Sequence, residues 1–372
     1  MFNGHLHPGI DLPHRQIRGA GGLHWNSYLS FVQGVRLHDR SDRRCGWGLY
    51  GRVGGRMSNS ERIAVIGAGL MGHGIAQVFA SRGHRVSLLD VNNEILAEAV
   101  EKIRANLTLL AQRGIGRTAE IESVLRRIRV TQDLKEGTSG ARFVFEAVSE
   151  KLDLKQGVFQ ELDALCPSDT ILATNTSVIS IAEIAAKAGR RDRIVGTHFW
   201  NPPYLVPLVE VIRGEATSPK VIDLTMDLLK SVGKHPVKVK KDVPGFVGNR
   251  LQHALWREAI SIVEHGIADP ATVDEVVKKG FGMRLPVLGP LENADMVGLD
   301  LTLQIHDYIL KHIERSPEAS PLLKRKVKEG DLGFRTGRGF HGWSRESIER
   351  CWRDLLEHLI RRNLDQREDR DD

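Results

Sequence analysis

One histidine and one glutamate stand out in an otherwise nearly uncharged stretch of the sequence. The stretch GTHFWNPPYLVPLVEVI contains His198 and Glu210, twelve residues apart. A histidine titrates near neutral pH and can take a proton from a hydroxyl group. A carboxylate that binds the other ring nitrogen fixes the tautomer and stabilises the imidazolium. The pair therefore has the residue types of a proton-transfer dyad, although a lone histidine at a strand end is more often structural.

Two strands must bring this pair together. The segments RIVGTHF and LVEVI are short and apolar, which is typical of buried strands. If the NPPYLVP segment between them folds back as a loop, His198 and Glu210 can meet. The spacing thus permits a proton-transfer pair in this apolar segment, and a structural histidine is the alternative.

A glycine-rich turn earlier in the chain predicts a dinucleotide site. Gly67, Gly69 and Gly72 form a GxGxxG pattern that follows the apolar segment RIAVIG and opens a helical segment. The first glycine permits the tight turn, the second leaves room for a pyrophosphate, and the third lets helix and strand pack closely. Leu70 and Met71 complete the turn, whose helix N-terminus offers free N–H groups to phosphate. A plain tight turn is the alternative.

Asp90 indicates which dinucleotide is bound. It ends the apolar segment RVSLLD, eighteen residues after Gly72, where a carboxylate can accept both ribose hydroxyls of an adenosine. The same carboxylate would repel a 2′-phosphate, and no arginine follows in VNNEIL to neutralise one. NAD is therefore predicted as the cofactor, rather than NADP.

Strand and helix patterns alternate up to about residue 243. Further strands are predicted at RFVFEAV and TILATN, and helical patterns fall between most strands, including a long one from about residue 92 to 127. Such alternation predicts a Rossmann-type α/β fold with a doubly wound, mostly parallel sheet. We expect an NAD-binding domain at 57–243, an all-helical C-terminal domain at 244–344 and a charged helical tail at 345–372.

Residues 1–56 differ from the rest of the chain. They hold eight arginines, three aspartates and eleven glycines, with no lysine or glutamate. Their net charge of +5 accounts for most of the whole-chain +6, so the rest is nearly neutral and no nucleic-acid surface is indicated. Neither helical nor strand periodicity is present. We expect a disordered extension, or a misassigned start with Met57 as the true initiator.

Composition disfavours several classes of protein. No window approaches eighteen consecutive apolar residues, so no membrane span is predicted. The three cysteines are far apart and odd in number, which fits a reducing, cytoplasmic compartment better than a disulfide framework. No Cys/His cluster has the spacing of a zinc site, so no metal is expected.

Taken in order, the motifs resemble those of the 3-hydroxyacyl-CoA dehydrogenase family over about residues 61–343. They are VIGAGLMGHGIAQVFA, FVFEAVSEKLDLKQGVF, LATNTS, GTHFWNPP, LVEVI, GKHPV, DVPGFVGNRL and TGRGF. The resemblance implies NAD-dependent oxidation of a 3-hydroxyacyl-CoA in fatty acid or hydroxybutyryl-CoA metabolism. It implies that His198 is the catalytic base and Glu210 its carboxylate partner. It also implies an active site between the two domains and a homodimer formed through the helical domain.

The resemblance implies roles for three polar residues near this dyad. Ser177 and Asn249 match residues that hold the substrate oxygen and the nicotinamide end of the cofactor, and Asn201 matches a residue beside that pocket. On residue type alone, Ser177 could equally be an ordinary turn residue. Asn249 could cap the helix that follows Pro244.

Four further residues match ligand contacts of the family. Glu150 and Lys155 match cofactor contacts, although both could belong to a solvated helix face. Asn106 and Arg113 lie where the family contacts coenzyme A. Arg113 is the one cationic anchor that we can name for a nucleotide phosphate of the substrate.

The sequence departs from the family around the histidine, which leaves the substrate open. Thr197 stands where the family often has an apolar residue, FWNPP replaces FFNPV, and Val178 replaces a second serine. The run PPYLVPLVE is closer to gulonate and carnitine dehydrogenases, whereas LGPLENADMVGLDLT resembles the acyl-CoA branch. A dehydrogenase of a free 3-hydroxy acid is therefore the alternative. A non-catalytic NAD(H)-binding protein is the third hypothesis.

Overall fold

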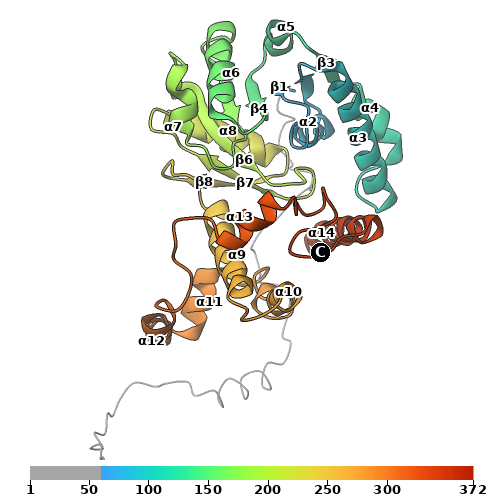
Figure 1. Cartoon of the computed structure of the whole chain (residues 1–372). Helices are drawn as coiled ribbons and strands as arrows, with labels where there is room; N and C mark the ends of the chain where they lie inside the picture. The colour runs from blue at the N-terminus through green and yellow to red at the C-terminus, as the bar shows by residue number, and fades with distance from the viewer. Residues whose placement is uncertain (1–59, 372) are drawn as a thin grey trace, which may run out of the picture. The chain divides into compact units, whose positions relative to one another are not determined.

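An eight-stranded sheet forms the core of the first domain (Figure 1). The structure, a computed structural model, describes residues 60–371, with side chains through residue 365, so the expected extension at 1–56 lies outside the described residues. The strands lie in the order β3-β2-β1-β4-β5-β6-β7-β8. They are β1 (Arg62–Ile66), β2 (Arg85–Leu89), β3 (Ile128–Thr131), β4 (Phe143–Glu146), β5 (Ile171–Thr174), β6 (Ile194–Phe199), β7 (Leu208–Ile212) and β8 (His235–Val239).

The sheet is parallel except at one pair of strands. β6 and β7 pair antiparallel and β8 runs parallel to β7, so the last two strands oppose the other six. β1 lies between β2 and β4, which places the reversal of strand order beside β1. Doubly wound sheets bind dinucleotides at this point, beyond the carboxyl ends of the strands. The mostly parallel, doubly wound sheet that the sequence predicts is confirmed.

Helices cover both faces of the sheet because alternate strand residues point to opposite sides. The helices of this domain are α2 (Gly72–Ser81), α3 (Asn93–Gln112), α4 (Ile121–Leu125), α5 (Leu134–Thr138), α6 (Leu152–Leu165), α7 (Ile181–Ile184) and α8 (Pro219–Ser231). Ile63 and Val65 of β1 pack with α2, α3 and α8, whereas Ala64 and Ile66 pack with α6 and α7. Burial on both faces explains why the strands read as nearly continuous apolar runs.

The second domain is helical, as predicted. Its helices are α9 (Gly248–Glu264), α10 (Pro270–Lys279), α11 (Pro290–Val297), α12 (Leu299–Ile309), α13 (Pro321–Lys328) and α14 (Arg345–Asp371). No residue of α10, α11 or α12 is buried, and Leu291 of α11 is 80% exposed. Across residues 60–371, no helix is both long and apolar enough to cross a bilayer.

The long helix expected from about residue 92 to 127 is wrong in its second half. α3 ends at Gln112, and Gly114 and Gly116 follow, each with a φ of 83°. Glycine adopts this left-handed backbone at little cost, and the helix ends there. The chain then forms a short 3-10 turn, α4 and the edge strand β3. The sequence did not predict β3, because its partly exposed residues form no apolar run.

Candidate active site

The glycine turn between β1 and α2 has the close contacts that the sequence predicts. Gly67 adopts a φ of 92°, and a Cβ added there would lie 2.6 Å from the Ala147 carbonyl oxygen. A Cβ on Gly72 would lie 1.7 Å from the carbonyl oxygen of Gly67. At Gly69, by contrast, no heavy atom lies within 4 Å of the added Cβ. The fold itself does not require a glycine at that position, so the space suits a ligand.

Asp90 lies beside this turn, directly after β2. Its Oδ2 accepts a hydrogen bond from the Ala68 N–H at 2.9 Å, and its Oδ1 accepts one from the Asn92 N–H at 3.2 Å. The carboxylate is thus fixed next to the turn, where it suits an adenosine ribose. Leu70 is 65% exposed, and Met71 lies at the N-terminus of α2.

His198 and Glu210 meet as the sequence predicts. They face each other in the antiparallel register of β6 and β7, and His198 Nδ1 lies 2.7 Å from Glu210 Oε2. Both side chains are buried, with 5% and 1% of the residue exposed. Trp200 and Phe246 pack beside the imidazole, with ring centroids 5.2 and 5.9 Å away. Apolar surroundings of this kind exclude water and strengthen the interaction between charges.

Glu210 is also bound by the first turn of the second domain. Its Oε1 accepts hydrogen bonds from the N–H groups of Val247 and Gly248, both at 3.0 Å, at the N-terminus of α9. Burial raises the pKa of Glu210, but the bonds from His198, Gly248 and Val247 outweigh burial and hold this pKa below its ordinary value. Glu210 is therefore the anion of the pair. Its bond to Nδ1 leaves the Nε2 of His198 to accept a proton.

Ser177 and Asn249 lie in direct contact. The Asn249 Nδ2 donates to the Ser177 carbonyl oxygen at 2.8 Å and so joins the loop after β5 to α9. Val247, rather than Asn249, occupies the N-cap position of α9. Asn175 was not predicted as a site residue, yet its Oδ1 accepts a hydrogen bond from the Phe199 N–H at 2.8 Å and ties the same loop to β6. The sequence feature that could have indicated Asn175 is its place as a polar residue directly after a buried strand.

Lys155 is buried and does not lie on a solvated helix face, and the more exposed Glu150 forms an ion pair with it. Lys155 has 0% exposure, and its Nζ lies 2.7 Å from Glu146 Oε1 and 3.2 Å from Glu150 Oε2. Glu150 Oε1 accepts hydrogen bonds from the Thr176 hydroxyl at 2.5 Å and the Ser177 N–H at 2.8 Å. Burial raises the pKa of Glu150, but Thr176, Lys155 and Ser177 outweigh burial and lower it. Glu146 was not predicted as the partner of Lys155, although a buried acid in a strand requires a cation or hydrogen-bond donors beside it.

The loop after β6 packs on the helix that begins at the glycine turn. A Cβ on Gly74 of α2 would lie 2.9 Å from the Pro203 side chain. The buried Lys234 donates hydrogen bonds to two carbonyl groups of this loop. Asn201, in the same loop, is exposed. The loop that joins the strands of the dyad therefore contacts the helix that begins at the dinucleotide turn.

Asn106 and Arg113 of α3 both bind other parts of the protein. The Asn106 Nδ2 donates to Gln77 Oε1, and its Oδ1 accepts from the Tyr204 hydroxyl, each at 3.1 Å. The Arg113 guanidinium lies 3.2 Å from Glu357 of α14. Tyr204 was not predicted from the sequence, because its partner is 98 residues away along the chain.

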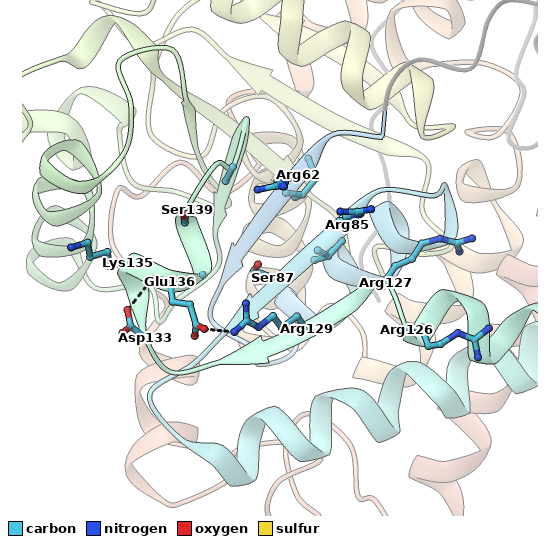
Figure 2. Close-up of a pocket in the computed structure, with 14 residues that line it drawn as sticks. Arg62, Arg85, Ser87, Arg126, Arg127, Arg129, Asp133, Lys135, Glu136 and Ser139 are labelled. Carbon is cyan, nitrogen blue, oxygen red and sulfur yellow. Dashed lines mark hydrogen bonds and ion pairs between the residues drawn. The ribbon is translucent and has the colours of Figure 1, made fainter.

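A separate cavity of about 760 Å³ lies at the other end of the strands (Figure 2). Arg62 and Arg85, which begin β1 and β2, line this cavity, and Arg129 forms an ion pair with Glu136 beside it. The glycine turn follows the opposite, carboxyl end of β1. This cavity is therefore not the dinucleotide site.

A dinucleotide turn beside a buried His–Glu dyad defines a nicotinamide-dependent dehydrogenase built on a Rossmann sheet. Comparison with known proteins supports the same class of enzyme. The family model described as 3-hydroxyacyl-CoA dehydrogenase, NAD binding domain, matches residues 62–243, and the model of the C-terminal domain of the same family matches residues 245–343. The chain belongs to the 3-hydroxyacyl-CoA dehydrogenase family and is an NAD-dependent oxidoreductase.

Its relatives differ in substrate. The chain is 41% identical over 288 residues to the probable 3-hydroxybutyryl-CoA dehydrogenase of Bacillus subtilis, a match that covers 77% of this chain and 99% of the relative. It is 35% identical over 310 residues to the 5-formyl-3-hydroxy-2-methylpyridine 4-carboxylate 5-dehydrogenase of Mesorhizobium japonicum, covering 83% and 99%. A crystal structure of an enzyme of this second kind, an NAD⁺-dependent dismutase, has a TM-score of 0.77 at 34% identity, covering 82% of this chain and 98% of that one.

Proposed function

We propose that the chain oxidises the 3-hydroxyl group of a 3-hydroxyacyl-CoA to a 3-oxo group. The observation that carries this proposal is the buried His198–Glu210 pair, 2.7 Å apart, in a segment whose loop packs on the glycine-turn helix. When bound, NAD would supply the acceptor for the hydride that leaves C3 of the substrate. The residues proposed to hold NAD are Gly67, Gly69, Leu70, Met71, Gly72, Asp90, Glu150, Lys155, Ser177 and Asn201. Lys155 is buried and would act through its ion pair with Glu150.

His198 takes the hydroxyl proton in this proposal. Because the Glu210 carboxylate binds Nδ1, the hydrogen lies on Nδ1 and the lone pair of Nε2 is available. The imidazolium that forms is stabilised by Glu210, whose charge is kept by two N–H groups of α9. In the reverse reaction the imidazolium returns the proton to the substrate oxygen.

Ser177 and Asn249 are proposed to bind the substrate oxygen. Asn249 uses one Nδ2 hydrogen on the Ser177 carbonyl, so its second hydrogen and the Ser177 hydroxyl are available as donors. Donors held in place before the reaction stabilise developing negative charge without reorganising. Asn106 and Arg113 are proposed as substrate contacts for the coenzyme A portion.

A free hydroxy acid, such as carnitine or gulonate, is the second candidate substrate. The specific observation in its favour is the ion pair between Arg113 and Glu357, because the proposed anchor for a nucleotide phosphate already has an anionic partner. The Mesorhizobium relative, whose name gives a pyridine carboxylate as its substrate, supports the same direction. A small substrate would need only Ser177, Asn249 and the dyad.

We also propose a homodimer formed through the helical domain. Leu291 and Leu299 are 80% and 64% exposed, and no residue of α10, α11 or α12 is buried. Apolar area of this extent on a soluble chain marks an interaction surface. A second copy of the same chain would bury it on both subunits.

A reducing, cytoplasmic compartment is proposed from the cysteines. Cys166 is buried and Cys351 is exposed, and both are free thiols. Burial raises the pKa of the Cys166 thiol, which keeps it protonated and unreactive. Free thiols persist in compartments where disulfides are reduced.

The proposal is tested by initial rates followed through NADH absorbance. Acetoacetyl-CoA is offered with NADH, and carnitine and gulonate are offered with NAD, to the full chain and to His198→Ala. We expect reduction of acetoacetyl-CoA that is lost in the variant. Turnover of the free acids alone would select the second candidate, and turnover unaffected by His198→Ala would contradict the role of the histidine.

A further inference from the structure

Helix α14 is docked on the NAD-binding domain beside α3 (Figure 1). Ile360 is 3% exposed and packs in one cluster with Leu110, Ile115 and Leu205. The apolar side chains of α14 that join this cluster are Leu356, Leu359 and Leu364. They recur every three to five residues, so one face of the helix is apolar. α14 begins at Arg345, two residues after the match to the family's C-terminal domain ends.

The docked helix contacts the loop that joins the two catalytic strands. The Asn363 Nδ2 donates to the Leu205 carbonyl oxygen at 3.2 Å. Leu205 lies seven residues after His198 and five before Glu210. The neighbouring Tyr204 is bound to Asn106 of α3. Residues of both α3 and α14 therefore bind the loop that joins β6 to β7.

The same helix supplies an anion to the end of α3. Arg113 is the C-cap of α3, and its Nη1 lies 3.2 Å from Glu357 Oε1, with the side chains 43% and 32% exposed. Glu357 Oε2 lies 3.9 Å from Arg361, one turn further along α14. Arg113 lies seven residues, or about 10 Å, beyond Asn106 along α3. A phosphate that approached Arg113 would meet a carboxylate of the same sign of charge.

We propose that α14 determines the substrate preference of this site, because Glu357 competes with the nucleotide phosphates of a CoA-bearing substrate for Arg113. The inference rests on the proposed dehydrogenase activity and concerns its substrate class. If Glu357 competes in this way, a thioester that carries the nucleotide should bind more weakly than it would if Arg113 had no carboxylate partner. Since the ion pair is partly exposed, the effect on affinity is about two- to fivefold.

The test compares two thioesters with the same reacting atoms. Acetoacetyl-CoA carries the nucleotide, and the acetoacetyl thioester of N-acetylcysteamine does not. KM and kcat are measured with NADH for the full chain and for Glu357→Gln, Glu357→Asp and Glu349→Gln. Glu349 is the matched control, because it lies on α14 and forms its ion pair with Arg345 of the same helix at 2.9 Å. Titration of free coenzyme A into the NADH complex gives affinity without turnover.

We expect Glu357→Gln to lower KM for acetoacetyl-CoA, and to strengthen coenzyme A binding, by about two- to fivefold. For this variant, kcat and the KM for the N-acetylcysteamine thioester should stay unchanged. Glu357→Asp and Glu349→Gln should behave as the unaltered chain. Equal shifts for both thioesters, or no shift in coenzyme A affinity, would overturn the role of α14. Absence of turnover with both thioesters would instead contradict the proposed function, whatever the coenzyme A titration gives.

Discussion

His198 and Glu210 lie opposite each other on β6 and β7, and one carboxylate oxygen of Glu210 binds the imidazole. The other oxygen accepts hydrogen bonds from two backbone N–H groups at the start of α9. One glutamate thus orients the histidine and joins the helical domain to the sheet. The hydrogen bonds of Glu210 therefore depend on both domains, because His198 lies in the sheet domain and Val247 and Gly248 lie at the start of the helical domain.

Glu210→Gln should change how the free energy of unfolding depends on pH. The pKa of Glu210 in the folded chain lies below the 4.5 ordinary for a glutamate, so its charge stabilises the fold above that pH. This contribution is lost as pH falls through the folded-state pKa. Near neutral pH, the free energy of unfolding of the unaltered chain should therefore exceed that of Glu210→Gln. This difference should shrink as the pH falls. Urea unfolding at fixed protein concentration measures it, and a difference independent of pH would contradict an anionic Glu210.

The second prediction separates two glycines of the dinucleotide turn. Gly69→Ala should leave the melting temperature unchanged, because no atom lies within 4 Å of the added Cβ, yet weaken NADH binding by at least about tenfold. Gly72→Ala should destabilise the fold itself, since its Cβ would lie 1.7 Å from a carbonyl oxygen. Thermal unfolding and NADH fluorescence titration measure both effects. Full NADH affinity in Gly69→Ala would mean that the cofactor does not pass this turn.

The third prediction concerns the buried lysine. Lys155→Met leaves Glu146 buried without its cation and should lower the free energy of unfolding by about 3–5 kcal/mol. The exposed Lys151 provides the control, and Lys151→Met should change stability by less than about 0.5 kcal/mol. Denaturant unfolding of both variants decides the matter. Equal stability of the two would show that the network around Glu146 does not hold the fold.

The fourth prediction concerns assembly. Leu291→Glu places a charge on the exposed apolar surface of α11 and should convert the proposed dimer to a monomer. Leu154→Glu, at another exposed leucine on α6 of the NAD-binding domain, should leave the assembly unchanged. Light scattering after size exclusion gives both masses. A monomeric unaltered chain would contradict the proposal, as would a Leu291→Glu chain that stays dimeric.

The parts of the site that the sequence predicted are those in which chemistry and local pattern coincide. The glycine turn follows a strand and opens a helix within six residues, so its role is readable locally. The spacing of His198 and Glu210 indicated a strand, a loop and a strand, and the register of β6 and β7 confirms their pairing. The alternation of strands and helices gave the Rossmann sheet for the same reason.

Contacts between distant segments were not predictable. The pairing of Arg113 with Glu357 spans 244 residues, and the apolar face of α14 does not indicate on which surface the helix docks. Lys155 has the residue type of an exposed helix position, yet it is buried because Glu146 and Glu150 supply charges. Edge strand β3 has too few buried residues to give a pattern.

We propose that His198 accepts the substrate proton during hydride transfer. The most direct measurement is the single-turnover rate of NADH formation from 3-hydroxybutyryl-CoA in His198→Gln, with the exposed His358→Gln as the control. We expect His198→Gln to be slower by about 100-fold or more, with NADH affinity unchanged, and His358→Gln to match the unaltered chain. A His198→Gln rate within about twofold of the unaltered chain would contradict the claim, because proton transfer would then be carried out by another group.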